Sequence, residues 1–385
     1  MDLLETVLSR DSSIKLFKKA LLNKTNIIDF YSNQNAIKYS NSYVIETSKI
    51  NPKNDSLDTS ILIKILEGYG LKRSRDTKIN HLFGMINEDF YETNFLLLNN
   101  FQNKVSFLDK FNLYFNLQMY FPTHYNLTYP HSFMLTNELQ WENIKNKVHI
   151  ARPIGGASGG DIINIHNSKT LEDAKKLLMT KYNDLGISIT EYITNPMLFK
   201  NKKMHVRGYM LFTLINNNFK SYFLEYGEIR TARNDYKNAD WNNNDIHDTH
   251  ERSTISKGLI FPNDLYNNTT PIIKNKDECQ IIYNNICNCI KYISKIASAN
   301  VFNFSNAKNT YEVYGIDILI KDDLSVFIME VNGRNVSYVS TPDLLLKKYF
   351  EWIDNVVIKP CLFPNLEIIQ TPSNTPIYDV IINDY

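Results

Sequence analysis

The sequence predicts an α+β fold, in which a mixed β-sheet is interleaved with helices and antiparallel hairpins. Residues 311–320 and 324–331 are apolar runs on either side of the turn-like Lys321-Asp-Asp323, a pattern typical of a β-hairpin. Further strand-like runs follow one another at 187–193, 204–215, 219–225 and 228–233. A long helix is predicted at 277–299, because apolar residues recur there at helical spacing: Ile282, Ile286, Ile290, Ile293 and Ala297.

The first 95 residues contain no chemical motif. They are rich in Asn, Ser and Lys with weak periodicity, and we expect a small N-terminal domain that is α/β or mostly helical. The next element is a predicted helix at 106–120, where Ser106 and Asp109 resemble a capping pair. Its apolar face would consist of Phe107, Phe111, Tyr114, Phe115 and Leu117.

Residues 148–165 read as a strand, a glycine loop and a second strand. The loop is Gly155-Gly-Ala-Ser-Gly-Gly160. A helix is predicted to follow, with Thr170 as its N-cap and leucines along one stripe. The polar residues 234–244 predict a mobile loop.

Composition and charge are those of an ordinary globular protein, with 43% hydrophobic and 22% charged residues in a chain of 385, long enough for two or three domains. The net charge of +1 argues against bulk electrostatic binding, so we expect neither nucleic acid nor a membrane as a partner. Four cysteines are too few for a disulfide framework, and Cys279, Cys287 and Cys289 are expected to be small core residues of the long helix itself. The chain lacks a signal-peptide pattern and a bilayer-length apolar run, which predicts a cytoplasmic protein.

Two carboxylates interrupt the apolar runs of the predicted hairpin. Asp317 and Glu330 lie in opposite strands near enough to converge, and Asn332 shares the face of Glu330 because side chains alternate along a strand. An ionised carboxylate in such surroundings needs a cation or a hydrogen-bond partner. Two carboxylates and an amide oxygen form a ligand set that suits Mg²⁺. The alternative is a hairpin whose acidic residues merely face solvent.

Several basic residues accompany this candidate metal site. Lys203, His205 and Arg207 alternate along one strand and therefore share one face, opposite Met204 and Val206. Arg152 precedes the glycine loop, whose backbone N–H groups could approach an anion. Arg230 lies in another short strand and needs a counter-charge, such as a phosphate or a substrate carboxylate. Taken singly, the glycine loop is explained equally well as a flexible hairpin loop, and each basic residue is explained better as an ordinary surface cation.

The order of these features over residues 104–350 resembles the tubulin tyrosine ligase-like family of ATP-grasp ligases. Residues 106–110 resemble the helix start whose lysine reaches the nucleotide phosphates, and 150–160 resemble the strand and flap over ATP. Residues 189–196 resemble the hinge "QEYI-x-NP", whose backbone holds adenine. The other matches are 203–210 to "K-F-D-x-R-x-Y-V", 224–232 to "Y-x-x-G-x-x-R-x-A", 246–250 to "H-L-T-N", and 314–317 with 330–332 to the magnesium hairpin. Seven motifs in one order are far more specific than any one of them.

The resemblance implies an ATP-grasp fold, in which two α+β lobes grip ATP after a small N-terminal domain. The implied division is an N-terminal domain at 1–95, a central lobe with the glycine loop at 96–195, a C-terminal lobe with the metal hairpin at 196–360, and a tail at 361–385. Asp317, Glu330 and Asn332 would hold Mg²⁺, while Arg207 and Arg230 would be catalytic. The implied ATP-binding residues are Lys110, Arg152, Gly156, Ser158, Gly159, Gly160, Glu191, Tyr192, Ile193, Lys203, His205 and His250.

The implied activity is an ATP-dependent carboxylate–amine ligase of the tubulin tyrosine ligase or polyglutamylase kind. Such an enzyme joins a free amino acid to a carboxylate of a protein acceptor, possibly tubulin, through an acyl phosphate. Three positions depart from the family pattern: Arg152 stands for a lysine, His205 for an aspartate and His250 for an asparagine. These departures keep an alternative open, namely a divergent nucleotide-binding pseudo-enzyme that acts as a binding module.

Overall fold

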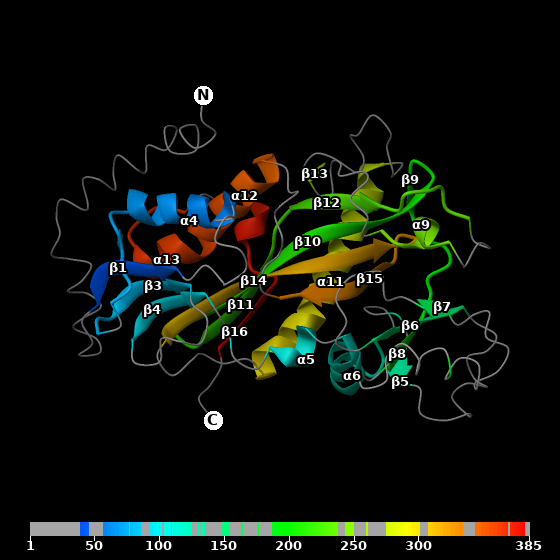
Figure 1. Cartoon of the computed structure of the whole chain (residues 1–385), viewed down its shortest axis with the longest axis horizontal. Helices are drawn as coiled ribbons and strands as arrows, with labels where there is room; N and C mark the ends of the chain where they lie inside the picture. Colours follow the sequence, from blue (N-terminus) through cyan, green and yellow to red (C-terminus); the bar gives the residue numbers. More distant parts are fainter. Residues whose placement is uncertain are drawn as a thin grey trace.

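The fold combines one large sheet and one small sheet with helices, as expected for the α+β class (Figure 1). The computed structural model describes residues 39–45, 57–76, 78–85, 93–99, 101, 104–108, 110–124, 130, 132–134, 148–153, 163–164, 176, 187–237, 243–249, 259–260, 275–300, 307–333, 343–368 and 370–381. Over these residues the large sheet has 12 strands and the small one has four. None of the helices described there has the length and apolar character required to cross a bilayer.

The antiparallel half of the large sheet is built on two long strands, β10 (Lys202–Ile215) and β14 (Ala307–Ile320), which pair along most of their length. The neighbours of these two strands, by pairing, are β9 (Leu198–Phe199), β11 (Asn218–Phe223), β12 (Tyr226–Thr231), β13 (Leu259–Ile260), β15 (Val326–Asn332) and β16 (Tyr378–Ile381). Asn216 and Asn217, with φ of 50° and 61°, form the tight turn between β10 and β11. The predicted strands in this region and the predicted hairpin are confirmed, with boundaries shifted by a few residues.

The parallel half of the large sheet comes from the first hundred residues. Its strands are β1 (Ser40–Ile45), β2 (Lys72–Arg73), β3 (His81–Met85) and β4 (Phe95–Asn99), with helix α4 (Leu57–Gly68) between β1 and β2. β1, β3 and β4 are mutually parallel, and β4 pairs in parallel with the first half of β14. These strands therefore extend the sheet that contains β10 and β14. The domain boundary at residue 95 stays a prediction.

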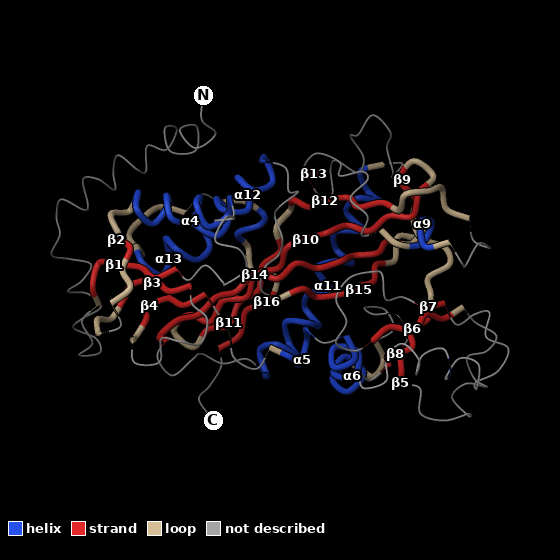
Figure 2. Tube along the Cα trace, in the orientation of Figure 1, coloured by secondary structure: helices blue, strands red, loops and turns tan. Residues whose placement is uncertain are grey.

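Helices cover both faces of the large sheet (Figures 1 and 2). On one face α5 (Val105–Leu108), α6 (Lys110–Tyr120) and α11 (Lys276–Asn300) pack against β10, β14 and β15. On the other face lie α4, α12 (Asp343–Ile353), a π-helix (Asp354–Ile358) and α13 (Lys359–Leu362). Cys279 and Cys289 are buried in α11, as predicted, and Cys287 is half-buried.

The structure differs from the predicted helix at 106–120 in three details. It is divided into α5 and α6, and Ser106 lies inside α5 rather than at its cap. Asp109 lies outside the described residues. Phe115 is 48% exposed, because α6 turns Leu113, Tyr114 and Leu117 toward the core and Phe115 away from it.

The small sheet consists of β5 (Ser132–Met134), β6 (His149–Pro153), β7 (Ile163–Asn164) and β8 (Ile187–Glu191) in the order β5-β8-β6-β7. All its pairs are antiparallel. The predicted glycine loop lies outside the described residues, as does the predicted helix after Thr170 apart from the helical residue Lys176. A short helix, α9 (Asn244–His247), begins at the last residue of the predicted loop 234–244.

A buried histidine makes the stability of the parallel half depend on pH. His81 is fully buried; its Nδ1 lies 2.7 Å from Ser42 Oγ, and its Nε2 lies 3.0 Å from the Asp76 carbonyl oxygen. Burial lowers the pKa of His81 and outweighs the opposing effect of Asp76. Below about pH 6.5 the unfolded chain binds a proton at this residue more readily than the folded chain does, so the free energy of unfolding decreases as pH falls.

We expect urea unfolding between pH 7.5 and 5.5 to show this loss, with a slope of at most about 1.4 kcal/mol per pH unit from one group. The variant His81→Asn should start less stable at pH 7.5 but lose less stability on acidification. His124→Asn, at an exposed position, is the control and should keep the wild-type slope. Equal slopes in the wild type and in His81→Asn would contradict the assignment.

A second prediction concerns the close approach of β12 to β10. A methyl group added at Gly227 would lie 2.8 Å from the Arg207 carbonyl oxygen, which belongs to the backbone of the neighbouring strand. Gly227→Ala should therefore lower the free energy of unfolding by about 1–3 kcal/mol, the usual cost of overpacking. Gly68→Ala, where nothing lies within 4 Å, should cost nothing in the same urea titration. A Gly227→Ala protein as stable as the wild type would show that the strands separate freely here.

Candidate functional site

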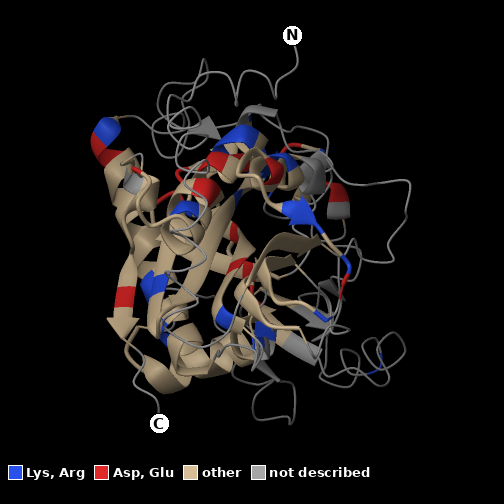
Figure 3. Ribbon diagram, turned by 90° about the vertical axis from the view of Figure 1, so that its left-hand side faces the viewer, with Lys and Arg blue, Asp and Glu red and all other residues tan. Residues whose placement is uncertain are grey.

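Charged side chains from four neighbouring strands form one row on the face of the large sheet that α12 also covers. The register aligns Glu228 of β12 with Arg207 of β10, Arg207 with Asp317 of β14, and Asp317 with Glu330 of β15. Met204 and Val206 lie in the apolar core on the opposite face, which confirms the predicted alternation along β10. Lys/Arg and Asp/Glu are otherwise interspersed over the molecule (Figure 3). The alignment of opposite charges is thus a feature of these four strands and not of the surface in general.

A β-bulge in β15 brings the predicted metal ligands together. Ile318 pairs with Ile328 and Asp317 pairs with Glu330, so Met329 is an extra residue in β15. Since side chains alternate, a regular strand would place Glu330 on the core face with Ile328. The extra residue turns Glu330 and Asn332 to the face of Asp317 instead.

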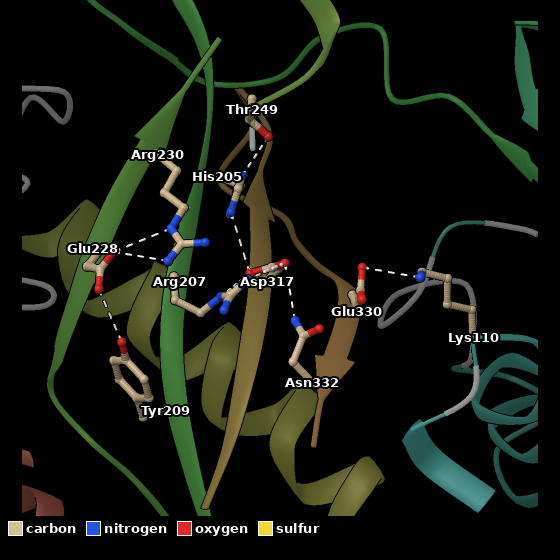
Figure 4. Close-up of polar contacts among 10 residues, drawn as sticks. All are labelled: Lys110, His205, Arg207, Tyr209, Glu228, Arg230, Thr249, Asp317, Glu330 and Asn332. Carbon is tan, nitrogen blue, oxygen red and sulfur yellow. Dashed lines mark hydrogen bonds and ion pairs between the residues drawn. The ribbon is translucent and has the colours of Figure 1, made fainter. Parts of the chain in front are cut away.

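Asp317 is the most strongly held carboxylate of the site. It is 3% exposed and accepts two hydrogen bonds from the Arg207 guanidinium, from Nε to Oδ1 and from Nη2 to Oδ2 at 3.0 Å (Figure 4). His205 Nε2 lies 3.4 Å from the same Oδ1. Burial would raise the pKa of Asp317, but the charges of Arg207 and His205 and their hydrogen bonds hold it well below its usual range. Asp317 is therefore an anion at neutral pH.

The other two predicted ligands complete a set of oxygen donors. Glu330 Oε2 lies 3.3 Å from Lys110 Nζ, which reaches it from the start of α6. The Asn332 amide Nδ2 lies 3.4 Å from Asp317 Oδ2. Over the described residues no group of three or more His, Cys, Asp or Glu side chains could hold a metal, so the protein donors that this site offers a divalent cation are two carboxylates and the Asn332 amide oxygen. Hard oxygen donors of this kind fit Mg²⁺.

A buried acidic residue that the sequence interpretation missed is also part of the row. Glu228 is fully buried; its Oε2 accepts hydrogen bonds from Arg230 Nε at 3.3 Å and Nη2 at 3.2 Å. Its Oε1 accepts a hydrogen bond from the Tyr209 hydroxyl at 3.2 Å (Figure 4). The signal was available, since an acidic residue two positions before Arg230 in a strand shares its face.

The predicted nucleotide hinge joins the small sheet to β10. Lys203 Nζ donates a hydrogen bond to the Tyr192 hydroxyl at 2.9 Å, and that hydroxyl lies 2.8 Å from His247 Nδ1. The Tyr192 backbone N–H donates to the Val148 carbonyl at 2.8 Å. Glu191 ends β8, half-buried and aligned with His149, and Ile193 follows in the connection to β9. Burial raises the pKa of the Tyr192 phenol, with Tyr236 adding to the effect, so the phenol is neutral.

Several predicted residues are not placed in the site. Arg152 is aligned with Ser188 in the small sheet by its backbone. Gly156, Ser158, Gly159, Gly160 and His250 lie outside the described residues. Thr249, the residue before His250, has its Oγ1 2.6 Å from His205 Nδ1. The chain at 249 therefore reaches the site.

Comparisons with known proteins show which proteins this chain resembles. The chain is 26% identical over 161 residues to a probable tubulin–tyrosine ligase of Schizosaccharomyces pombe, covering 39% of this chain and 38% of that protein. It is 23% identical over 249 residues to tubulin glycylase 3C of Tetrahymena thermophila, covering 61% of this chain and 22% of that protein. The chain thus spans less than half the length of either of these curated relatives. The model of the tubulin-tyrosine ligase family matches residues 71–335, more than half of the chain, so the protein belongs to the tubulin-tyrosine ligase family, as its sequence motifs predicted.

Proposed function

We propose that this protein is an ATP-dependent ligase with an ATP-grasp fold that joins a free amino acid to a carboxylate of a protein acceptor. Membership of the tubulin-tyrosine ligase family supports a protein-modifying ligase in general. The observation that carries the proposal is the row in which the β15 bulge brings Asp317, Glu330 and Asn332 beside Arg207. The two relatives are a probable tubulin–tyrosine ligase and a tubulin glycylase, which makes tubulin the first acceptor to test.

In this proposal Asp317, Glu330 and Asn332 hold Mg²⁺. Bound there, the metal would neutralise the charge that develops as phosphate is transferred. Asp317 is ready for this role because its pKa is held low. Lys110 already lies beside Glu330 and would reach the nucleotide phosphates from the start of α6.

The nucleotide would lie between this row and the hinge. We propose that Arg152, Lys203 and the loop residues Gly156, Ser158, Gly159 and Gly160 bind the phosphates. The Tyr192 N–H is engaged by Val148, so the backbone of Glu191 and Ile193 would hold adenine, with Tyr192 packed beside it. His205 and His250 are proposed neighbours of the nucleotide.

The reaction would proceed in two balanced steps. An oxygen of the acceptor carboxylate attacks the γ-phosphorus of ATP, the bond to the β-phosphate oxygen breaks, and an acyl phosphate and ADP form. The amine of the amino acid then attacks the acyl carbon, loses a proton and expels phosphate, which leaves an amide bond. Arg230, whose side chain is 18% exposed, would bind the acceptor carboxylate and the acyl phosphate. Arg207 would act from the fixed position that Asp317 gives it.

One observation favours the second candidate, a nucleotide-binding module without catalysis. His205 is 4% exposed and is engaged by Asp317 and Thr249. It stands where the family has an aspartate associated with the nucleotide sugar, and a buried histidine does not replace that contact.

Turnover separates the two candidates. A ligase should release ADP at least about tenfold faster when both tubulin and an amino acid are present with Mg²⁺ and ATP, because each is a substrate. The measurement is ADP release with tyrosine, glutamate and glycine in turn, followed by mass spectrometry of tubulin. A protein that binds ATP but leaves it intact with every mixture would be the binding module.

Metal binding is tested without turnover. Mg-ATP should raise the melting temperature by mass action, by an amount equivalent to about 2.7 kcal/mol at a hundredfold excess over Kd. Glu330→Gln should lose most of the part that depends on Mg²⁺, since it removes one anionic ligand. Asp323→Asn, in the exposed turn of the same hairpin, is the control and should respond like the wild type. An unchanged response in Glu330→Gln would remove this residue from the metal site.

A further inference from the structure

We infer that Glu228 is a positioning residue for the proposed ligase reaction: it fixes Arg230 at the site and balances the charge of the two adjacent guanidinium groups. The inference rests on the proposed function, which it deepens. Glu228 itself is fully buried and would touch neither nucleotide nor acceptor. Its effect on the reaction must therefore pass through Arg230, the basic side chain that it bonds directly.

Glu228 bonds one of the two arginines and is aligned with the other. It bonds to Arg230 through Oε2 and is the register partner of Arg207 across β12 and β10. Arg230 is aligned with His205, two residues from Arg207, so both guanidinium groups project from the same face of adjacent strands. Both oxygens of Asp317 are already bonded to Arg207. Without Glu228, one partly buried guanidinium would keep no counter-charge among the described residues.

The other oxygen of Glu228 is fixed from the side of α12. Tyr209 donates its hydroxyl hydrogen bond to Oε1 and is itself 1% exposed. The Tyr209 ring packs edge-on against Tyr349 of α12, with centroids 5.6 Å apart. Both carboxylate oxygens are therefore bonded, and the orientation of Arg230 is determined by the packing of α12 on the sheet.

This arrangement predicts that removing the charge of Glu228 slows turnover without weakening the binding of an anion at Arg230. Arg230 bonds a single oxygen of Glu228 through two of its N–H groups, and its side chain keeps 18% exposure for an anion. Removing the negative charge of Glu228 increases the positive potential at the site, so an anion binds at least as tightly. The guanidinium loses its fixed orientation, however, and the reaction slows because orientation is what such a donor contributes.

The test compares Glu228→Gln, Arg230→Ala and the double variant, with Mg-ATP, tubulin and the amino acid that the wild type uses. Glu228→Gln should lower kcat about tenfold or more while KM for the acceptor stays the same or falls. Because Glu228 acts through Arg230, the double variant should be no slower than Arg230→Ala within about twofold. Multiplicative losses in the double variant would overturn the inference.

A second measurement keeps the inference testable if the wild type turns nothing over. Binding of inorganic phosphate in the presence of Mg-ADP should weaken about fivefold or more in Arg230→Ala and be equal or tighter in Glu228→Gln. That result without turnover would reject the ligase function and retain the anion-positioning role. Absence of phosphate binding in the wild type, or binding indifferent to Arg230→Ala, would overturn the inference itself.

Two variants control for folding. Tyr209→Phe removes only the hydroxyl that holds Glu228 and should lower kcat in the same direction by a smaller factor, even if Glu228→Gln folds poorly. Glu312→Gln removes a buried carboxylate that pairs with Lys104 and Tyr314 at the other half of β14. The Glu312→Gln protein should have a lower free energy of unfolding than the wild type and the same kcat. A loss of kcat in Glu312→Gln equal to that in Glu228→Gln would show that any buried charge has this effect, and would overturn the assignment.

Discussion

The buried ion pair between Arg207 and Asp317 is the interaction on which the rest of the site depends. It joins the two central strands β10 and β14 at a point where both partners are less than a tenth exposed. Removing two charges from water is costly, and the cost is offset only when geometry and further hydrogen bonds are favourable. Both carboxylate oxygens are bonded by the guanidinium, and His205 and Asn332 lie beside them. Loss of either partner would leave an uncompensated charge in the middle of the sheet.

Around this pair, the two other carboxylates of the row each lie beside a basic side chain. Glu330 lies beside Lys110, and Glu228 lies beside Arg230. The side chains are therefore held in place before any ligand binds, which limits the reorganisation that binding requires. The same groups that hold one another are those that would exchange partners with metal and phosphate. The strands of the sheet fix the backbone positions of these residues, and their charged groups are the ones that would bind the ligands.

Much of this could be predicted from residues alone, because strands with strong apolar patterns fold as their pattern indicates. The hairpin of β14 and β15, the alternation of Lys203, His205 and Arg207, and the long helix α11 are examples. Other features could not be predicted. The apolar pattern at 106–120 does not reveal that Val105–Leu108 and Lys110–Tyr120 are two elements, α5 and α6. The pairing of β4 with β14 joins residues about two hundred positions apart, and no local pattern specifies such a contact.

The sequence by itself determined the motifs and their order along the chain, and hence the family. Only the tertiary structure decided how they meet. Alternation in β15 would carry Glu330 into the core with Val326 and Ile328, and the extra residue Met329 reverses this. The partnership of Glu228 with Arg207 likewise exists only through the register of β12 on β10. A bulge and a register are properties of two strands together, because each is defined by hydrogen bonds to the neighbouring strand.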